Sequence, residues 1–154
     1  MPKVSATIEV DAAQETVFDF LADYRNIPRL QPQFVSAKLA GEIERGLGAT
    51  MDLHGSFHGL PMNTREHIVA FTPPHRLVSI GEGAILSRTT WELKPAGKDG
   101  DPVTEVKVSV EYKAGGPLGG IFTGWAVSLF HKEIQQMTDE SLRRLRAFIT
   151  QPAK

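Results

Sequence analysis

Residues 115–134 read GGPLGGIFTGWAVSLFHKEI, a glycine-rich stretch that leads into the longest helical pattern of the chain. From Pro117 to about Ile149 the apolar residues recur with a period of 3.6, which predicts one long C-terminal helix. A continuous seam on one side of this helix should pack on a sheet: Thr123, Val127, Phe130, Ile134, Met137, Ser141, Leu145 and Phe148. The opposite side of the second half is polar, with Lys132, Gln136, Asp139, Arg143 and Arg146.

The first half of the same helix carries a second apolar stripe, made of Leu118, Phe122, Trp125 and Leu129. Three glycines lie beside it, and each costs a helix roughly 1 kcal/mol relative to alanine. We therefore expect the C-terminal half to be firmly packed and a cavity to lie under the glycine-rich half. Two alternatives stay open. The stripe is ordinary core covered by residues 27–32, or it borders a ligand entrance, a homodimer contact or a membrane surface.

The rest of the chain has mainly the period-two pattern of strands. A strand is expected at residues 3–10, followed by two short helical segments before Pro32. Asp11 and Gln14 are spaced as a capping box for the first of these helices. Further strands are expected at 34–39, 49–58, 62–71, 76–81, 84–94 and 103–113. This order predicts an α+β fold with an antiparallel sheet.

Composition narrows the function classes. The 154 residues suit a single domain spanning 1–154. Lys plus Arg (17) nearly balance Asp plus Glu (18), which argues against a nucleic-acid partner. The chain has no cysteine, so disulfides and thiolate chemistry are excluded. The N-terminal residues lack the apolar core of a signal peptide, and we expect a soluble, cytoplasmic protein.

Three stretches together carry a family resemblance: VSATIEVDAAQETVFDFLADYRNIPRLQP at 4–32, REHIVAFTPPHRLVSIGEG at 65–83 and TTWELKPAGKDGDPVTEVKVSVEY at 89–112. Their order, closed by the long helix, resembles the START/polyketide-cyclase (SRPBCC) superfamily. The resemblance implies the helix-grip fold, in which a curved antiparallel sheet wraps around the C-terminal helix and two short helices follow the first strand. It also implies a hydrophobic ligand cavity between sheet and helix. Catalytic residues differ between branches of the superfamily, so none is transferred to this chain.

The function expected from these observations is binding or transport of a hydrophobic small molecule or lipid in that cavity. The side chains expected to line it are Met51, Leu53, Phe57, Ile68, Trp91, Phe122, Trp125, Val127 and Phe130. Apolar burial would supply the binding free energy, at about 25 cal/mol per Å².

Glu66 is the one candidate for a catalytic residue. A hairpin with a two-residue Gly59–Leu60 loop pairs Leu53 with Glu66 and Met51 with Ile68, which places Glu66 in the cavity. A carboxyl group in an apolar cavity has a raised pKa, which suits an acid–base role in a polyketide cyclase or dehydratase, the alternative function. A register that differs by one residue would turn Glu66 to water.

Neither a metal nor another cofactor is expected. His54 and His58 share a strand face but lie roughly 13 Å apart, too far to bind one ion. His67 lacks a third ligand nearby, and His131 is expected to be exposed or to lie at the cavity rim. The expected partner is therefore the small-molecule or lipid ligand. Peripheral membrane contact and a homodimer stay open through Trp125 and Leu129.

Overall fold

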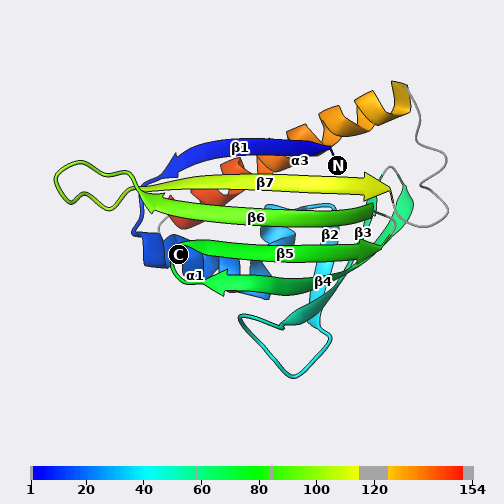
Figure 1. Ribbon diagram of the computed structural model, residues 1–154, viewed down its shortest axis with the longest axis horizontal. Helices are drawn as coiled ribbons and strands as arrows, with labels where there is room; N and C mark the ends of the chain where they lie inside the picture. The colour runs from blue at the N-terminus through cyan, green and yellow to red at the C-terminus, as the bar shows by residue number, and fades with distance from the viewer. Residues whose placement is uncertain (1, 58, 84, 115–124, 151–154) are drawn as a thin grey trace.

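The computed structural model describes residues 2–57, 59–83, 85–114 and 125–150 (Figure 1). Strand β1 (Lys3–Val10) is followed by α1 (Gln14–Ala22), a 3-10 turn (Tyr24–Asn26) and the short α2 (Ile27–Leu30). The remaining strands follow in order, and α3 (Trp125–Thr150) closes the chain. They are β2 (Phe34–Leu39), β3 (Thr50–Phe57), β4 (Leu60–Thr72), β5 (Arg76–Gly83), β6 (Ile85–Pro95) and β7 (Thr104–Ala114). The predicted α+β order is confirmed.

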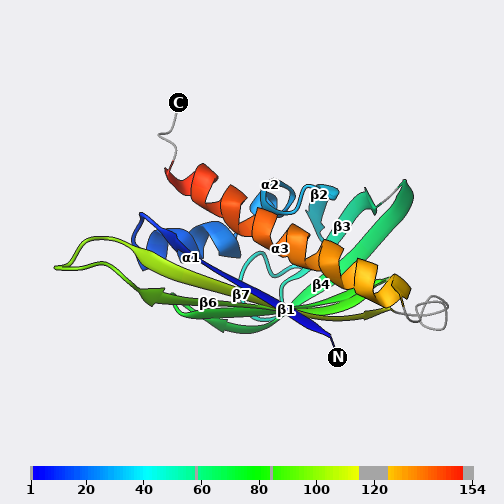
Figure 2. The same cartoon turned by 90° about the horizontal axis from the view of Figure 1, so that it is seen from above.

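The strands form one antiparallel sheet in the order β1-β7-β6-β5-β4-β3-β2. Helices α1, α2 and α3 lie on the same side of this sheet, and its β2–β3 end rises beside α3 (Figure 2). The sheet therefore curves around the helix, as expected. A β-bulge between Phe34 and Ser36, where β2 pairs with β3, marks this raised end.

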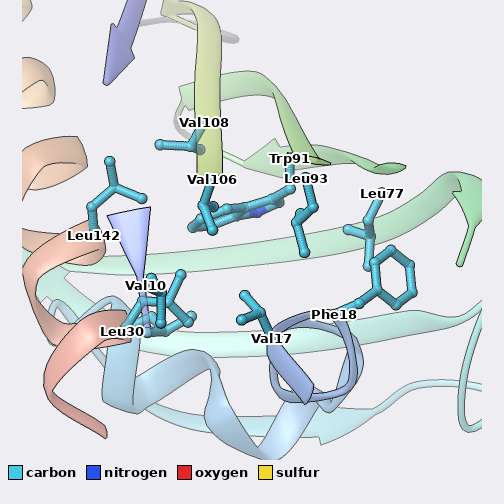
Figure 3. Packing of buried hydrophobic residues seen from close by; sticks show 11 residues of the cluster. Val10, Val17, Phe18, Leu30, Leu77, Trp91, Leu93, Val106, Val108 and Leu142 are labelled. Atoms are coloured by element: carbon cyan, nitrogen blue, oxygen red, sulfur yellow. The ribbon is translucent and has the colours of Figure 1, made fainter. Parts of the chain in front are cut away.

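The main hydrophobic core lies under the C-terminal half of α3 and beneath α1. Val17 and Phe18 from α1 meet Trp91, Leu93 and Val106 from the sheet (Figure 3). Leu142 and Leu145 of α3 join this cluster and are almost fully buried. The prediction that the second half of the long helix is the packed end is confirmed.

The helical seam is confirmed where the structure describes it, with one exception. Ile134, Ser141 and Leu145 are buried, but Phe148 is 40% exposed. The ring of Phe148 stacks on Phe20 at 6.3 Å between centroids, and the Arg29 guanidinium lies 5.7 Å from its centre. Phe148 therefore packs beside α1 and α2 and not on the sheet.

Part of the prediction for α3 falls on residues that the structure does not describe. Residues 115–124 lie outside the described chain, which removes Leu118, Phe122 and Thr123 from the comparison. The backbone of α3 begins at Trp125, but the side chains of residues 125–129 are not described, including Trp125, Val127 and Leu129. The second apolar stripe stays a prediction.

The predicted β3–β4 register is wrong by two residues. Phe57 pairs with Leu60, so Met51 lies opposite Glu66, where Ile68 was expected, and Leu53 opposite Thr64. Gly59 adopts a φ of 79°, which a glycine reaches without steric penalty, and it precedes the first paired residue of β4. The reversal thus falls one residue earlier than predicted. A shift of two leaves every side chain on its predicted face.

The predicted capping box is also wrong. Helix α1 begins at Gln14 with Ala13 at the N-cap, and no side chain caps it. The Gln14 amide instead donates to the carbonyl oxygens of Pro74 at 2.9 Å and Leu93 at 3.1 Å. Partly buried carbonyl groups need donors, so Gln14 ties α1 to the sheet.

Candidate functional site

A cavity of about 100 Å³ lies between the middle of α3 and strands β3, β4, β6 and β7. Its apolar wall includes Phe34, Leu53, Met62, Trp91, Val108, Val110, Ile134 and Met137. Its polar lining is larger than the sequence indicated and includes Gln31, Gln33, Thr64, Glu66, Ser87, Thr89, Tyr112, Thr138 and Ser141. The cavity was expected under the first half of the helix, but in the described chain its helical wall is residues 134–141.

The structure divides the predicted lining residues into three groups. Leu53, Glu66 and Trp91 line the cavity. Met51 and Ile68 instead line a second pocket of about 40 Å³, which shares Gln31, Glu66 and Trp91 with the first. The two pockets therefore meet at these three residues.

The aromatic residues Phe57 and Phe130 lie at one end of the sheet, outside the lining of the cavity. The Phe130 ring contacts the rings of Tyr112, at 5.3 Å between centroids, and Phe57, at 6.3 Å. Phe57 borders a surface groove together with Pro32, Glu133 and Arg143. Phe122 is not described, nor are the side chains of Trp125 and Val127, so their assignment to the cavity stays a prediction.

Glu66 has the most unusual environment of the polar lining residues. It lies on β4 opposite Gly81 of β5, and Ser79 Oγ donates a hydrogen bond to its Oε1. Burial raises the pKa of Glu66, while the Ser79 hydrogen bond and the charge of His67 act in the opposite direction. Its second oxygen, Oε2, receives no hydrogen bond from any residue that the structure describes. One carboxyl oxygen is thus available to a molecule in the cavity.

The raised pKa of Glu66 makes stability depend on pH in a defined direction. In the unfolded chain a glutamate titrates at about 4.3. Between that value and the raised folded value, the folded state binds more protons, so the free energy of unfolding falls as pH rises. The Glu66→Gln variant has no carboxyl group at this position, so its free energy of unfolding lacks this decrease with pH. We therefore expect the difference in free energy of unfolding, variant minus wild type, to increase with pH across this interval and to stay constant above it.

Urea denaturation at a series of pH values measures this difference. The exposed Glu92→Gln variant controls for the loss of one carboxylate from the surface. A difference for Glu66→Gln that stays constant or decreases as pH rises would contradict the assigned burial of Glu66.

Gly81 leaves a notch in the floor of the cavity. Strand pairing aligns Glu66, Gly81, Ser87 and Tyr112 in one row across β4, β5, β6 and β7. A Cβ atom at Gly81 would lie 2.7 Å from Ser87 Oγ and 3.1 Å from Thr64 Cγ2. The missing side chain therefore separates the polar groups and keeps space between them.

Most hydroxyl groups around this notch have no partner within the described chain. Ser79 donates to Glu66, and the neighbouring row pairs Ser79 with Thr89. The hydroxyls of Thr64, Ser87 and Thr89 make no hydrogen bond to another described residue. Sequence reasoning did not identify Ser87 or Thr89, although both have the same parity as Trp91 on β6. We call Thr64, Glu66, Ser79, Ser87 and Thr89 the polar notch.

Tyr112 connects the cavity wall to the outer side of α3. Its ring is buried, and its hydroxyl lies 2.5 Å from Nδ1 of His131, which is an exposed residue. Burial raises the pKa of the Tyr112 phenol. His131 was expected to be exposed or to lie at the cavity rim; it is exposed and contacts the Tyr112 hydroxyl, but it does not line the cavity.

No group of three or more potential metal ligands occurs among the described residues. His54 Nδ1 lies 2.9 Å from the Asn63 side-chain oxygen, and His67 Nδ1 lies 3.1 Å from the Thr50 hydroxyl. These two histidines make side-chain hydrogen bonds across the β3–β4 pair. In the described chain, no helix combines the length and apolar character needed to cross a bilayer.

Residues 1–147 match the model of the family described as polyketide cyclase/dehydrase and lipid transport. No curated protein matches the sequence. Among solved structures, protein TTHA0849 of Thermus thermophilus is similar over 96% of this chain and 97% of its own, with 19% identity and a TM-score of 0.78.

Two further solved structures share the fold. A START superfamily protein of Mycobacterium smegmatis is 14% identical, with 96% of each chain covered and a TM-score of 0.77. The Zhui aromatase/cyclase of a Streptomyces species is 16% identical over 96% of this chain and 93% of its own, with a TM-score of 0.76. At these identities the similarity establishes the architecture and not the ligand.

Proposed function

The chain belongs to the polyketide cyclase/dehydrase and lipid transport family, within the START-like superfamily, and from this premise we propose that it binds a small, largely apolar molecule in the cavity beneath α3. The observation that carries the proposal is the cavity itself, about 100 Å³ in volume and walled by Phe34, Leu53, Trp91 and Met137. Protein interiors hold few voids larger than a water molecule. A space of this size in an otherwise well-packed domain is a feature that a ligand can use.

The volume favours a small molecule over a lipid. An engineered apolar cavity of about 150 Å³ binds benzene, so the space enclosed here suits a molecule of about one ring. The adjoining pocket adds only about 40 Å³ beyond Glu66 and Trp91. A long acyl chain exceeds these two spaces, and the rest of it would have to lie in the open surface groove that shares Gln33 and Met137 with the cavity.

An acid–base enzyme is the second candidate, and one observation favours it. The Glu66 side chain is half-buried in the cavity wall, burial raises its pKa, and its Oε2 lacks a partner in the described chain. These are the properties of a group that exchanges a proton with a bound molecule. A ligand that Glu66→Gln binds with unchanged affinity but no longer converts would assign this role.

Ligand binding can be tested with a substitution on β6 that places a larger side chain in the cavity. Thr89→Leu adds bulk to the cavity lining, whereas Thr90→Leu makes the same change on the opposite face of β6. We expect toluene or phenol, each one ring in size, to raise the melting temperature of the wild type and of Thr90→Leu but not of Thr89→Leu. At a ligand concentration 100 times Kd the stabilisation is about 2.7 kcal/mol.

Isothermal titration calorimetry gives the affinities directly. Equal stabilisation of all three proteins would place the ligand elsewhere on the molecule. No stabilisation of the wild type by either compound would contradict the proposed function.

A further inference from the structure

The polar notch restricts the chemistry of a molecule that the cavity can hold. It brings one carboxyl group and four hydroxyl groups together on strands β4, β5 and β6, and the rest of the cavity wall carries aromatic and aliphatic side chains besides polar ones such as Gln31, Gln33 and Ser141. Polar groups inside a protein are normally hydrogen-bonded, either to other protein groups or to water. Ser79 is satisfied by Glu66. Oε2 of Glu66 and the hydroxyls of Thr64, Ser87 and Thr89 have no partner in the described chain, and these four residues are half-buried, so water or a bound molecule can reach their oxygen atoms.

The protonation state of the Glu66 carboxyl sets the direction of the hydrogen bond. An ionised glutamate only accepts hydrogen bonds, and Ser79 already donates to Oε1, so a ligand group at Oε2 must then be a donor. In the protonated form, which the raised pKa favours, Oε2 itself donates and the ligand group must accept. The serine and threonine hydroxyls on β6 can donate in turn, so the same ligand group should also accept a hydrogen bond. An alcohol or phenol hydroxyl meets both requirements with a single atom.

Charge excludes a further class of ligand. Among the described residues that line the cavity, none is Lys or Arg, and Glu66 is the only residue with an acidic side chain. An anionic headgroup, such as the carboxylate of a fatty acid or a phosphate, would meet the Glu66 carboxyl with no cation in the lining of the same cavity, because Arg45 lines only the adjoining pocket and is paired with Asp19. The cavity therefore disfavours anions.

We propose that the cavity binds a neutral compound of about one ring in size, with a hydroxyl group in the polar notch against Oε2 of Glu66. The proposal rests on the proposed function and narrows it to a class of ligand. The apolar part of the molecule lies against Trp91, Val108 and Met137. The hydroxyl gives orientation and selectivity, because a ligand without it leaves the notch unpaired.

Pairs of probes that differ in one group test the proposal. Phenol and toluene have nearly the same size, and benzoate and benzylamine add an anion and a cation to the same ring. Calorimetric titration of the wild type should show phenol binding at least tenfold more tightly than toluene, and benzoate binding more weakly than either. Glu66→Leu should abolish the preference for phenol, while Glu66→Gln, whose side-chain oxygen still accepts a hydrogen bond, should keep part of it.

The outcomes separate this inference from the proposed function. If toluene and phenol bind equally and Glu66→Leu changes neither affinity, the cavity binds ligands but the hydroxyl assignment is wrong. If benzylamine binds more tightly than phenol and loses that affinity in Glu66→Gln, the ligand is a cation and the neutral assignment is wrong. If no probe binds the wild type, the proposed function itself fails.

Discussion

Gly55→Ala is expected to destabilise the protein by roughly 3 kcal/mol or to prevent folding. A Cβ atom at Gly55 would lie 1.7 Å from the carbonyl oxygen of Gln33 and 2.7 Å from the Cα of Phe34. Both contacts are with backbone, so no side-chain rotation relieves them. The same carbonyl of Gln33 accepts a hydrogen bond from the Ser56 amide at 3.0 Å, and separating the strands would break it.

Thermal unfolding measures the loss, which should lower the melting temperature by about 6–12 °C for a domain of this size. Gly41→Ala is the matched control, since a Cβ there meets nothing within 4 Å. We expect the control to change stability by no more than about 0.5 kcal/mol. Similar melting temperatures for the two variants would contradict the close approach of β2 and β3. Because Gln33 and Phe34 line the cavity, a folded Gly55→Ala protein should also bind its ligand more weakly.

Leu145→Ala is expected to cost about 3–5 kcal/mol in free energy of unfolding. Leu145 is fully buried where the second half of α3 packs on the main core. Removing its side chain leaves a void between helix and sheet, in addition to the lost transfer free energy. The variant therefore weakens the packing of the second half of α3 on the sheet. Leu145 does not belong to the polar notch, so the substitution removes no group from it.

Urea denaturation with comparison of midpoints and slopes gives this value. Leu47→Ala makes the same chemical change at a side chain that is 65% exposed, and we expect a loss of no more than about 0.5 kcal/mol. A small change in the free energy of unfolding for Leu145→Ala would mean that other residues hold α3 against the sheet. An equal effect at both positions would argue against the core assigned here.

The element order followed from the sequence because each element keeps a clear period. The alternation of Val4, Ala6, Ile8 and Val10 predicts β1 with its observed bounds, since alternate residues of a strand face opposite sides. The seam on α3 likewise predicts which face packs. Local patterns of this kind are properties of consecutive residues, so a single sequence contains them.

The polar notch could not be read in the same way. Gly81 and Ser87 meet through pairing between β5 and β6, and Glu66 joins them through β4. Predicting this row requires the register of three strands, whereas the side-chain pattern gives only which face a residue occupies. A shift of two residues between β3 and β4 preserves every face, and the pattern could therefore not reveal that error. The same limit explains why Met51 and Ile68 were assigned to the main cavity although they line the smaller pocket.

Gln33 and Met137 border both the cavity and the groove on the outer surface. Both are long, unbranched side chains, and methionine has three rotatable bonds and adapts readily to its surroundings. A solute that crosses between groove and cavity at this point needs rotamer changes in these two residues and no separation of α3 from the sheet. Rotamer changes of this kind are far faster than the opening of packed elements. Ligand exchange past Gln33 and Met137 would leave α3 in place on the sheet. The residence time of a ligand would then depend on its contacts inside the cavity and not on the unfolding rate of the domain.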